Sequence, residues 1–131
     1  MIILDTHVLA WLLTDPDRLS RPASSAIRRA RVSDGLAISS ITLWELALMF
    51  ARGAMRAPGT TEDAVRGFVT RSGVNVRPLT PEIASLATQF PDSYPRDPAD
   101  RLIGATARAE GMVLVTRDER IRSSPLLRTI W

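Results

Sequence analysis

The stretch PADRLIGATARAEGMVLVT, residues 98–116, decides the fold class because it holds a complete helix-to-strand unit. Pro98 suits the first helical position, and Gly111 suits the end of a helix over 98–111. The run 112–116 that follows is apolar on both faces. Such runs are typical of parallel strands that helices cover on either side. This unit therefore indicates an α/β protein.

The rest of the chain repeats the alternation of short apolar runs and helix-length amphipathic runs. We predict an α/β fold with a mostly parallel sheet, formed by all 131 residues as one domain. Strands are expected at 1–4, 36–39, 74–79, 112–116 and 126–131. Helices are expected at 6–13, 21–32, 60–73, 80–90 and 98–111, with another between Ser39 and Gly53.

The composition is that of a globular protein without a membrane-spanning segment. Apolar residues make up 45% of the chain and charged residues 24%, which is ordinary for a globular protein. No apolar stretch reaches the length of a membrane span, no signal peptide is evident and there is no cysteine, so we expect a cytoplasmic protein without thiolate metal sites. All 17 basic residues are arginine, and the net charge of +3 permits a nucleic-acid partner without requiring one.

Four acidic residues fall at or just beyond the expected carboxyl ends of the strands, where open α/β sheets bind ligands. Glu45 is the only charged residue between positions 36 and 51, which argues against an ordinary solvated face. Capping of the next helix is an open alternative for two of the others, Asp5 and Asp118. The candidate site residues are Asp5, Glu45, Asp100 and Asp118.

Asp97 and Asp100 lie three residues apart, and their positions around Pro98 separate their roles. With proline as the first helical residue, Asp97 is the N-cap and Asp100 falls in the first turn. We therefore assign Asp100 to the site. Asp97 is expected to cap the helix and to have a possible outer-shell role.

Four converging carboxylates would repel one another, so the cluster makes physical sense around a cation. Oxygen ligands favour Mg²⁺ or Mn²⁺, which could activate a water for attack on a phosphodiester. Thr6 and Thr116 lie beside the same strand ends and could hydrogen-bond the carboxylates, with capping as the alternative. His7, the only histidine, is expected to lie outside the site.

Four segments together resemble the PIN-domain nucleases, in particular the VapC-like toxins of toxin–antitoxin pairs. They are LDTHVLAWLL, ISSITLWELALM, PRDPADRLIGATA and LVTRDERI, in family order across nearly the whole chain. The resemblance implies a Rossmann-like, three-layer PIN domain with its acidic motif at Asp5, Glu45, Asp100 and Asp118. It also implies a Mg²⁺- or Mn²⁺-dependent endoribonuclease that acts on RNA.

The resemblance further implies a homodimer and a small antitoxin that covers an apolar groove and the mouth of the active site. Residues 43–59, rich in Trp, Leu, Met and Phe, could supply this groove or could simply be core. Three arginines near the expected site could contact RNA phosphates: Arg96, Arg101 and Arg117.

Other functions fit less well. A haloacid-dehalogenase-like phosphotransferase needs a second Asp where His7 stands, and it normally uses a lysine, which this chain lacks. The missing lysine also argues against a response-regulator receiver. No G-x-G-x-x-G follows the first strand, so a dinucleotide site is not predicted. A catalytically silent PIN-like module that binds RNA or protein is the remaining alternative, and metal binding would distinguish it from the enzyme.

Overall fold

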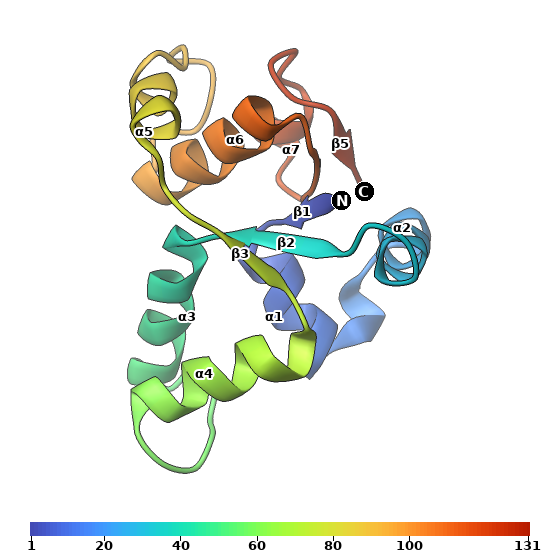
Figure 1. The fold of residues 1–131 in the computed structure, drawn as a ribbon, viewed down its shortest axis with the longest axis vertical. Helices are drawn as coiled ribbons and strands as arrows, with labels where there is room; N and C mark the ends of the chain where they lie inside the picture. The colour runs from blue at the N-terminus through green and yellow to red at the C-terminus, as the bar shows by residue number, and fades with distance from the viewer.

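A five-stranded parallel sheet forms the centre of the protein in a computed structural model that describes residues 1–131 (Figure 1). The strand order is β3-β2-β1-β4-β5, and every neighbouring pair is parallel. The sheet confirms the predicted fold class, and the last strand of the chain lies at one edge. The strands are β1 (Ile2–Leu4), β2 (Leu36–Ser39), β3 (Asn75–Arg77), β4 (Val113–Val115) and β5 (Thr129–Ile130).

Helices cover both faces of the sheet and give a three-layer arrangement (Figure 1). One layer holds α1 to α4, and the other holds α5 to α7. The helices are α1 (Thr6–Thr14), α2 (Arg21–Arg31), α3 (Ile41–Ala51), α4 (Thr61–Ser72), α5 (Pro81–Thr88), α6 (Pro98–Glu110) and α7 (Glu119–Arg122), with a 3₁₀-helix η1 (Pro16–Arg18) after α1. None of them is both long and apolar enough to cross a bilayer.

Alternation along the strands divides the core between the two layers. In the central strand, Leu4 packs into the cluster formed with α1 to α4, whereas Ile3 packs into the cluster formed with α5 to α7. Both side chains are fully buried. Because successive side chains of a strand point to opposite faces, the short strand β1 contributes side chains to both core clusters.

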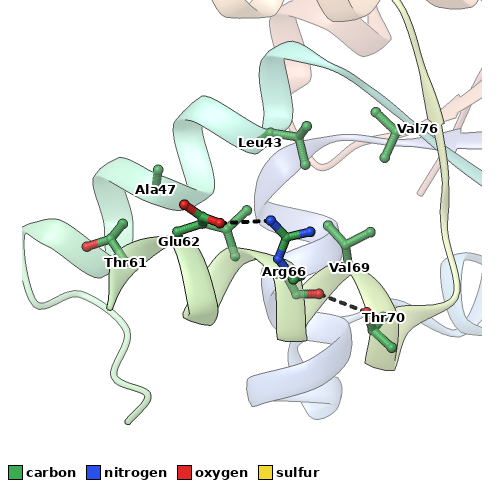
Figure 2. Close-up of a pocket in the computed structure, with 9 residues that line it drawn as sticks. Leu43, Ala47, Thr61, Glu62, Arg66, Val69, Thr70 and Val76 are labelled. Carbon is green, nitrogen blue, oxygen red and sulfur yellow. Dashed lines mark hydrogen bonds and ion pairs between the residues drawn. The ribbon is translucent and has the colours of Figure 1, made fainter. Parts of the chain in front are cut away.

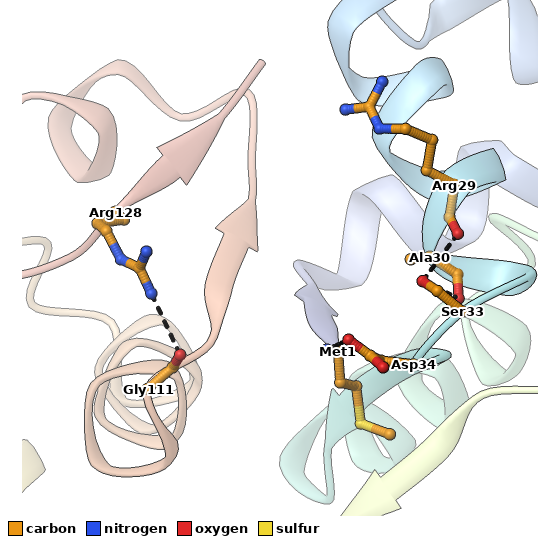
Figure 3. Close-up of polar contacts among 7 residues, drawn as sticks. All are labelled: Met1, Arg29, Ala30, Ser33, Asp34, Gly111 and Arg128. Atoms are coloured by element: carbon orange, nitrogen blue, oxygen red, sulfur yellow. Dashed lines mark hydrogen bonds and ion pairs between the residues drawn. The ribbon is translucent and has the colours of Figure 1, made fainter.

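Polar contacts close the sheet at the amino ends of its strands (Figure 3). The amino group of Met1 lies 3.3 Å from a carboxylate oxygen of Asp34, just before β2. Arg128, just before β5, donates to the carbonyl of Gly111 at 3.3 Å, just before β4. The opposite edge, at the carboxyl ends, carries the predicted site residues.

Capping of the helices agrees closely with the sequence. Ser20 and Thr80 cap α2 and α5, and Gly111 ends α6 with a positive φ of 65°. Helix α3 begins without a capping bond from its N-cap residue, because the Ser40 side chain accepts no hydrogen bond there. Instead, the hydroxyl of the buried Ser39 accepts a long hydrogen bond of 3.4 Å from the amide of Ile41.

Candidate active site

A cavity of about 460 Å³ lies beyond the carboxyl ends of the strands and collects acidic side chains from four segments of the chain. All four predicted site acids line it, together with the helix-capping Asp97. Because these acids are up to 113 positions apart in sequence (Asp5 and Asp118), only the sheet topology brings them together. The lining residues are Asp5, His7, Val8, Trp11, Glu45, Asp97, Asp100, Arg117 and Asp118.

Two of the acids cap helices and also line the cavity. Asp5 follows β1 and accepts from the amide of Thr6 at 2.8 Å, at the start of α1. Asp118 accepts from the amides of Arg120 and Ile121 at 2.9 and 3.2 Å, at the start of α7. Both capping bonds of Asp118 use Oδ1, which leaves Oδ2 for other partners. Capping and a place in the cavity are therefore compatible in the same side chain.

Asp97 and Asp100 differ in their hydrogen bonding at the start of α6. Oδ1 of Asp97 accepts from the amides of Ala99 and Asp100 at 2.8 and 3.4 Å, which makes Asp97 the N-cap. The carboxylate of Asp100 accepts no hydrogen bond from the protein, so both of its oxygens are free. Asp97 nevertheless lines the cavity as well.

Glu45 is held by a chain of two buried threonine hydroxyls. The Thr6 hydroxyl donates to Oε1 of Glu45 at 2.5 Å and lies 3.0 Å from the Thr42 hydroxyl. Because Thr6 has a single hydroxyl proton, Thr42 must be the donor in the second bond. Thr42 and Thr6 are 0% and 1% exposed. Neither the sequence pattern nor the resemblance pointed to Thr42.

Thr116 connects the two acids that follow the adjacent strands β1 and β4. Its hydroxyl donates to Oδ2 of Asp5 at 2.7 Å and accepts from the amide of Asp118 at 3.1 Å. This side chain is fully buried. Thr6 and Thr116 thus contact the carboxylates directly and lie behind them, outside the cavity lining.

Burial and mutual repulsion raise the pKa of three of these acids. Desolvation is the largest cause for Asp5 and Glu45, although hydrogen bonds from Thr116 and Thr6 oppose it. The pKa of Asp100 rises to about 7, through desolvation and then through the negative charges of the other four acids. Without a bound cation, the cavity therefore carries an excess of negative charge.

The donor set fits a hard divalent cation, because every acidic ligand offers oxygen. As they stand, no three acidic or histidine side chains are placed so that they could hold a metal ion together. Mg²⁺ commonly keeps several waters and takes only one or two carboxylates, so the arrangement is still compatible with such an ion.

The three predicted RNA-contacting arginines lie in different surroundings. Arg117 lines the cavity and Arg96 is exposed. The guanidinium of Arg101 instead donates to backbone carbonyls of the preceding loop, at 2.7 Å to Phe90 and 3.1 Å to Pro91. Arg101 therefore ties the start of α6 to the chain that leads into it.

Three residues that the sequence interpretation left out also line the cavity: His7, Val8 and Trp11. His7, expected outside the site, lies there with Trp11, one helical turn further along α1. Their ring centroids are 5.9 Å apart with an interplanar angle of 52°. The available signal was the i, i+4 spacing of these rings directly after Asp5, which places them on one helix face.

Comparisons with known proteins agree with this architecture. The chain is 39% identical to Ribonuclease VapC22 of Mycobacterium tuberculosis (strain ATCC 25618 / H37Rv), over 99% of this chain and 98% of the relative. Two solved structures share the fold at lower identity. A DNA-bound VapBC from Salmonella typhimurium is 23% identical with a TM-score of 0.72, and covers 98% of this chain and 97% of its own.

The second structure, a toxin–antitoxin complex from Klebsiella pneumoniae, is 22% identical with a TM-score of 0.67. The match covers 97% of this chain and 95% of that one. At the level of sequence families, the PIN domain matches residues 2–125. This match spans the whole sheet except β5 and includes every acid of the cavity. The chain therefore belongs to the PIN-domain family.

Proposed function

We propose that this protein is a metal-dependent endoribonuclease that acts as the toxin of a toxin–antitoxin pair. The observation that carries the proposal is the convergence of Asp5, Glu45, Asp100 and Asp118 on one cavity, with raised pKa values in the first three. A cluster of unpaired carboxylates destabilises the apo protein and is useful when it holds a cation. The name of the relative from M. tuberculosis supports RNA as the substrate.

In this proposal Asp5, Glu45, Asp100 and Asp118 hold Mg²⁺ or Mn²⁺, directly or through water. When bound, such an ion polarises a water and neutralises charge on a phosphodiester. Asp100 offers two free oxygens, and Glu45 is oriented by Thr6. Thr116 fixes Asp5, and Asp97 forms the cap that sets the first turn of α6.

Arg117 is the arginine that we place on the RNA backbone, because it alone of the three lines the cavity. Its guanidinium can donate two parallel hydrogen bonds to a phosphate. The exposed Arg96 remains a candidate for a more distant phosphate. Arg101 has little freedom to serve this role, because its donors are engaged by loop carbonyls.

The antitoxin is proposed to occupy an apolar pocket of about 590 Å³ between α3 and α4. Leu43 and Ala47 of α3, Val69 of α4 and Val76 of β3 are among the residues that line it (Figure 2). Leu43 and Ala47 belong to the predicted groove segment 43–59, and Leu43 also packs against the core, as do Phe50 and Met55 of that segment. The VapBC and toxin–antitoxin complexes among the similar structures support a protein partner.

A homodimer is the second assembly that we propose. Trp44, on α3, is 59% exposed and Leu79 is 40% exposed, so apolar surface is available for self-association. Sedimentation of the purified chain would measure its mass directly. A monomer at micromolar concentration would remove this part of the proposal.

The decisive test is cleavage of total bacterial RNA by the purified chain in EDTA, Mg²⁺ or Mn²⁺, with Asp5→Asn in parallel. Discrete metal-dependent cuts that vanish in the variant would support the nuclease. The alternative is a silent RNA- or protein-binding module, favoured by the absence of a ready-made metal cluster. Lack of cleavage and of metal binding by a folded protein would favour that module.

A further inference from the structure

Aromatic and cationic side chains gather around Trp11 at one wall of the acidic cavity. The guanidinium carbon of Arg18 lies 4.6 Å from the centroid of the Trp11 ring, and that of Arg117 lies 5.8 Å from it. His7 and the C-terminal Trp131 approach the same indole, with ring centroids at 5.9 and 6.1 Å. Residues from α1, η1, the β4–α7 loop and the C-terminus therefore meet on one ring.

The charged members of this cluster have no acidic partner. The three ion pairs of the protein involve neither Arg18 nor Arg117. Both arginines and His7 are exposed, and Trp11 is half-buried at the cavity wall. Contacts of an exposed guanidinium with an aromatic ring are weaker than its charge-assisted hydrogen bonds to a phosphate. These cations are thus held near the cavity but remain available to an anionic ligand.

The location of the cluster addresses an electrostatic problem of the proposed substrate. RNA is a polyanion, and the adjacent cavity carries five carboxylates. Cations beside such a cavity favour the approach of a strand. Arg117 lies at the cavity itself, and Arg18 extends the positive charge across Trp11. No comparable group of cations and rings lies elsewhere around the cavity lining.

We propose that Trp11, Arg18, Arg117 and His7 form a binding subsite for one unpaired nucleotide of the RNA strand, next to the bond that is cleaved. This inference rests on the proposed ribonuclease function. The base stacks on the indole in place of Arg117, the more distant guanidinium, which turns to the phosphate. A base within a duplex is not free to stack in this way, so the subsite selects single-stranded RNA.

Binding to a cleavage-deficient chain tests the subsite separately from catalysis. Asp100→Asn serves as the parent, and the probes are a fluorescein-labelled single-stranded 12-mer of uridine and adenosine and the same sequence in a duplex. Fluorescence anisotropy gives each Kd. Adding Trp11→Leu should weaken single-strand binding about tenfold and leave duplex binding nearly unchanged, whereas Trp11→Phe should retain most of the affinity.

The arginines provide a second, independent measurement that does not alter the packing of α1. Arg117→Gln should weaken binding and reduce the slope of log Kd against log salt by about 0.7, the loss of one phosphate contact on a single strand. Arg128→Gln, at the opposite edge of the sheet, is the matched control and should leave both quantities unchanged.

Kinetics in the otherwise unaltered protein distinguish failure of the subsite from failure of the proposed function. Trp11→Leu should raise KM about tenfold and change kcat by about twofold or less. Cleavage with an unchanged KM, or equal loss of single-strand and duplex binding, would overturn the subsite and leave the nuclease intact. Absence of both cleavage and RNA binding in the unaltered protein would overturn the nuclease and the subsite together.

Discussion

The two ends of helix α6 each carry a carboxylate, and their surroundings are opposite. Glu110 lies in the last turn, where the helix dipole disfavours negative charge, yet Arg77 pairs with it. The Nε atom of Arg77 lies 3.0 and 3.2 Å from the two carboxylate oxygens. Asp100 lies in the first turn, where the dipole favours negative charge, yet its pKa rises to about 7.

The two carboxylates differ in what surrounds them. At Glu110, an unfavourable position is offset by a cation from β3, so the charge supports the fold. At Asp100, a favourable position is overridden by burial and by four neighbouring acids. A divalent cation at the amino end of α6 would therefore relieve the repulsion among these carboxylates.

The largest expected effect comes from removing the same charge at the two ends of α6. Asp100→Asn should reduce RNA cleavage by about 100-fold or more, since it removes a proposed metal ligand. Its melting temperature should be unchanged or higher, because repulsion among the acids decreases. Glu110→Gln should keep full activity and lose about 1 kcal/mol of unfolding free energy. Similar activity losses in both variants would remove the functional distinction between the two ends.

A smaller effect is expected from the hydroxyl chain that orients Glu45. Thr42→Val keeps the shape of the side chain and removes the donor to Thr6, so kcat should fall about fivefold, the equivalent of one hydrogen bond. Thr42→Ser restores the hydroxyl and should restore activity and Mn²⁺ affinity. If Thr42→Ser is as defective as Thr42→Val, methyl packing matters at this position and the hydroxyl chain does not.

Stability of the apo protein should depend on pH in the direction set by Asp100. Its pKa is raised from 3.8 to about 7 by the fold, so the folded state holds this proton more tightly than the unfolded chain. The resulting stability is full below about pH 4 and is lost as pH rises to about 7. Asp5 and Glu45, whose pKa values are also raised, act in the same direction.

Thermal unfolding in EDTA between pH 5 and 8 measures this dependence. The melting temperature should fall by about 3 °C or more with rising pH, and Mg²⁺ at pH 7.5 should restore it. Asp100→Asn should flatten the profile, while Glu110→Gln should keep its slope. A melting temperature that rises with pH in EDTA would contradict the electrostatic account of the cavity.

The smallest effect tests the division of roles within the amino end of α6. Asp97→Asn keeps a side-chain acceptor for the amide of Ala99, so most activity and stability should remain. Asp97→Ala should lose about 1 kcal/mol of unfolding free energy, measured by urea denaturation. Loss of cleavage in Asp97→Asn equal to that in Asp100→Asn would show that Asp97 belongs to the site itself.

Much of the fold follows from local signals in the sequence. The apolar run of β4 and the proline and glycine that bound α6 predict these two elements almost to the residue. The rule that ligands bind at the carboxyl ends of strands then predicts that four acids distant in sequence lie near one another. For Asp5 and Asp118, capping and site membership were alternatives, and the structure shows the capping bonds in residues that also line the cavity.

The missed contacts depend on how helices are placed relative to one another. Thr42 meets Thr6 only because α3 packs beside α1, which no local pattern of either helix specifies. The orientation of α1 turns His7 and Trp11 toward the cavity. Arg101 is of a residue type that often contacts RNA, but its guanidinium donates to loop carbonyls ten and eleven residues away. Periodicity identifies helix faces but not the partners of those faces.

Calorimetric titration with Mn²⁺ at pH 7.5 tests most directly the claim that the unpaired acids form one cation site. The unaltered protein should bind Mn²⁺, Asp100→Asn should bind it at least about tenfold more weakly, and Glu110→Gln should bind it as the unaltered protein does. Equal affinity in all three proteins, or no binding at millimolar Mn²⁺ by the folded unaltered protein, would contradict the account.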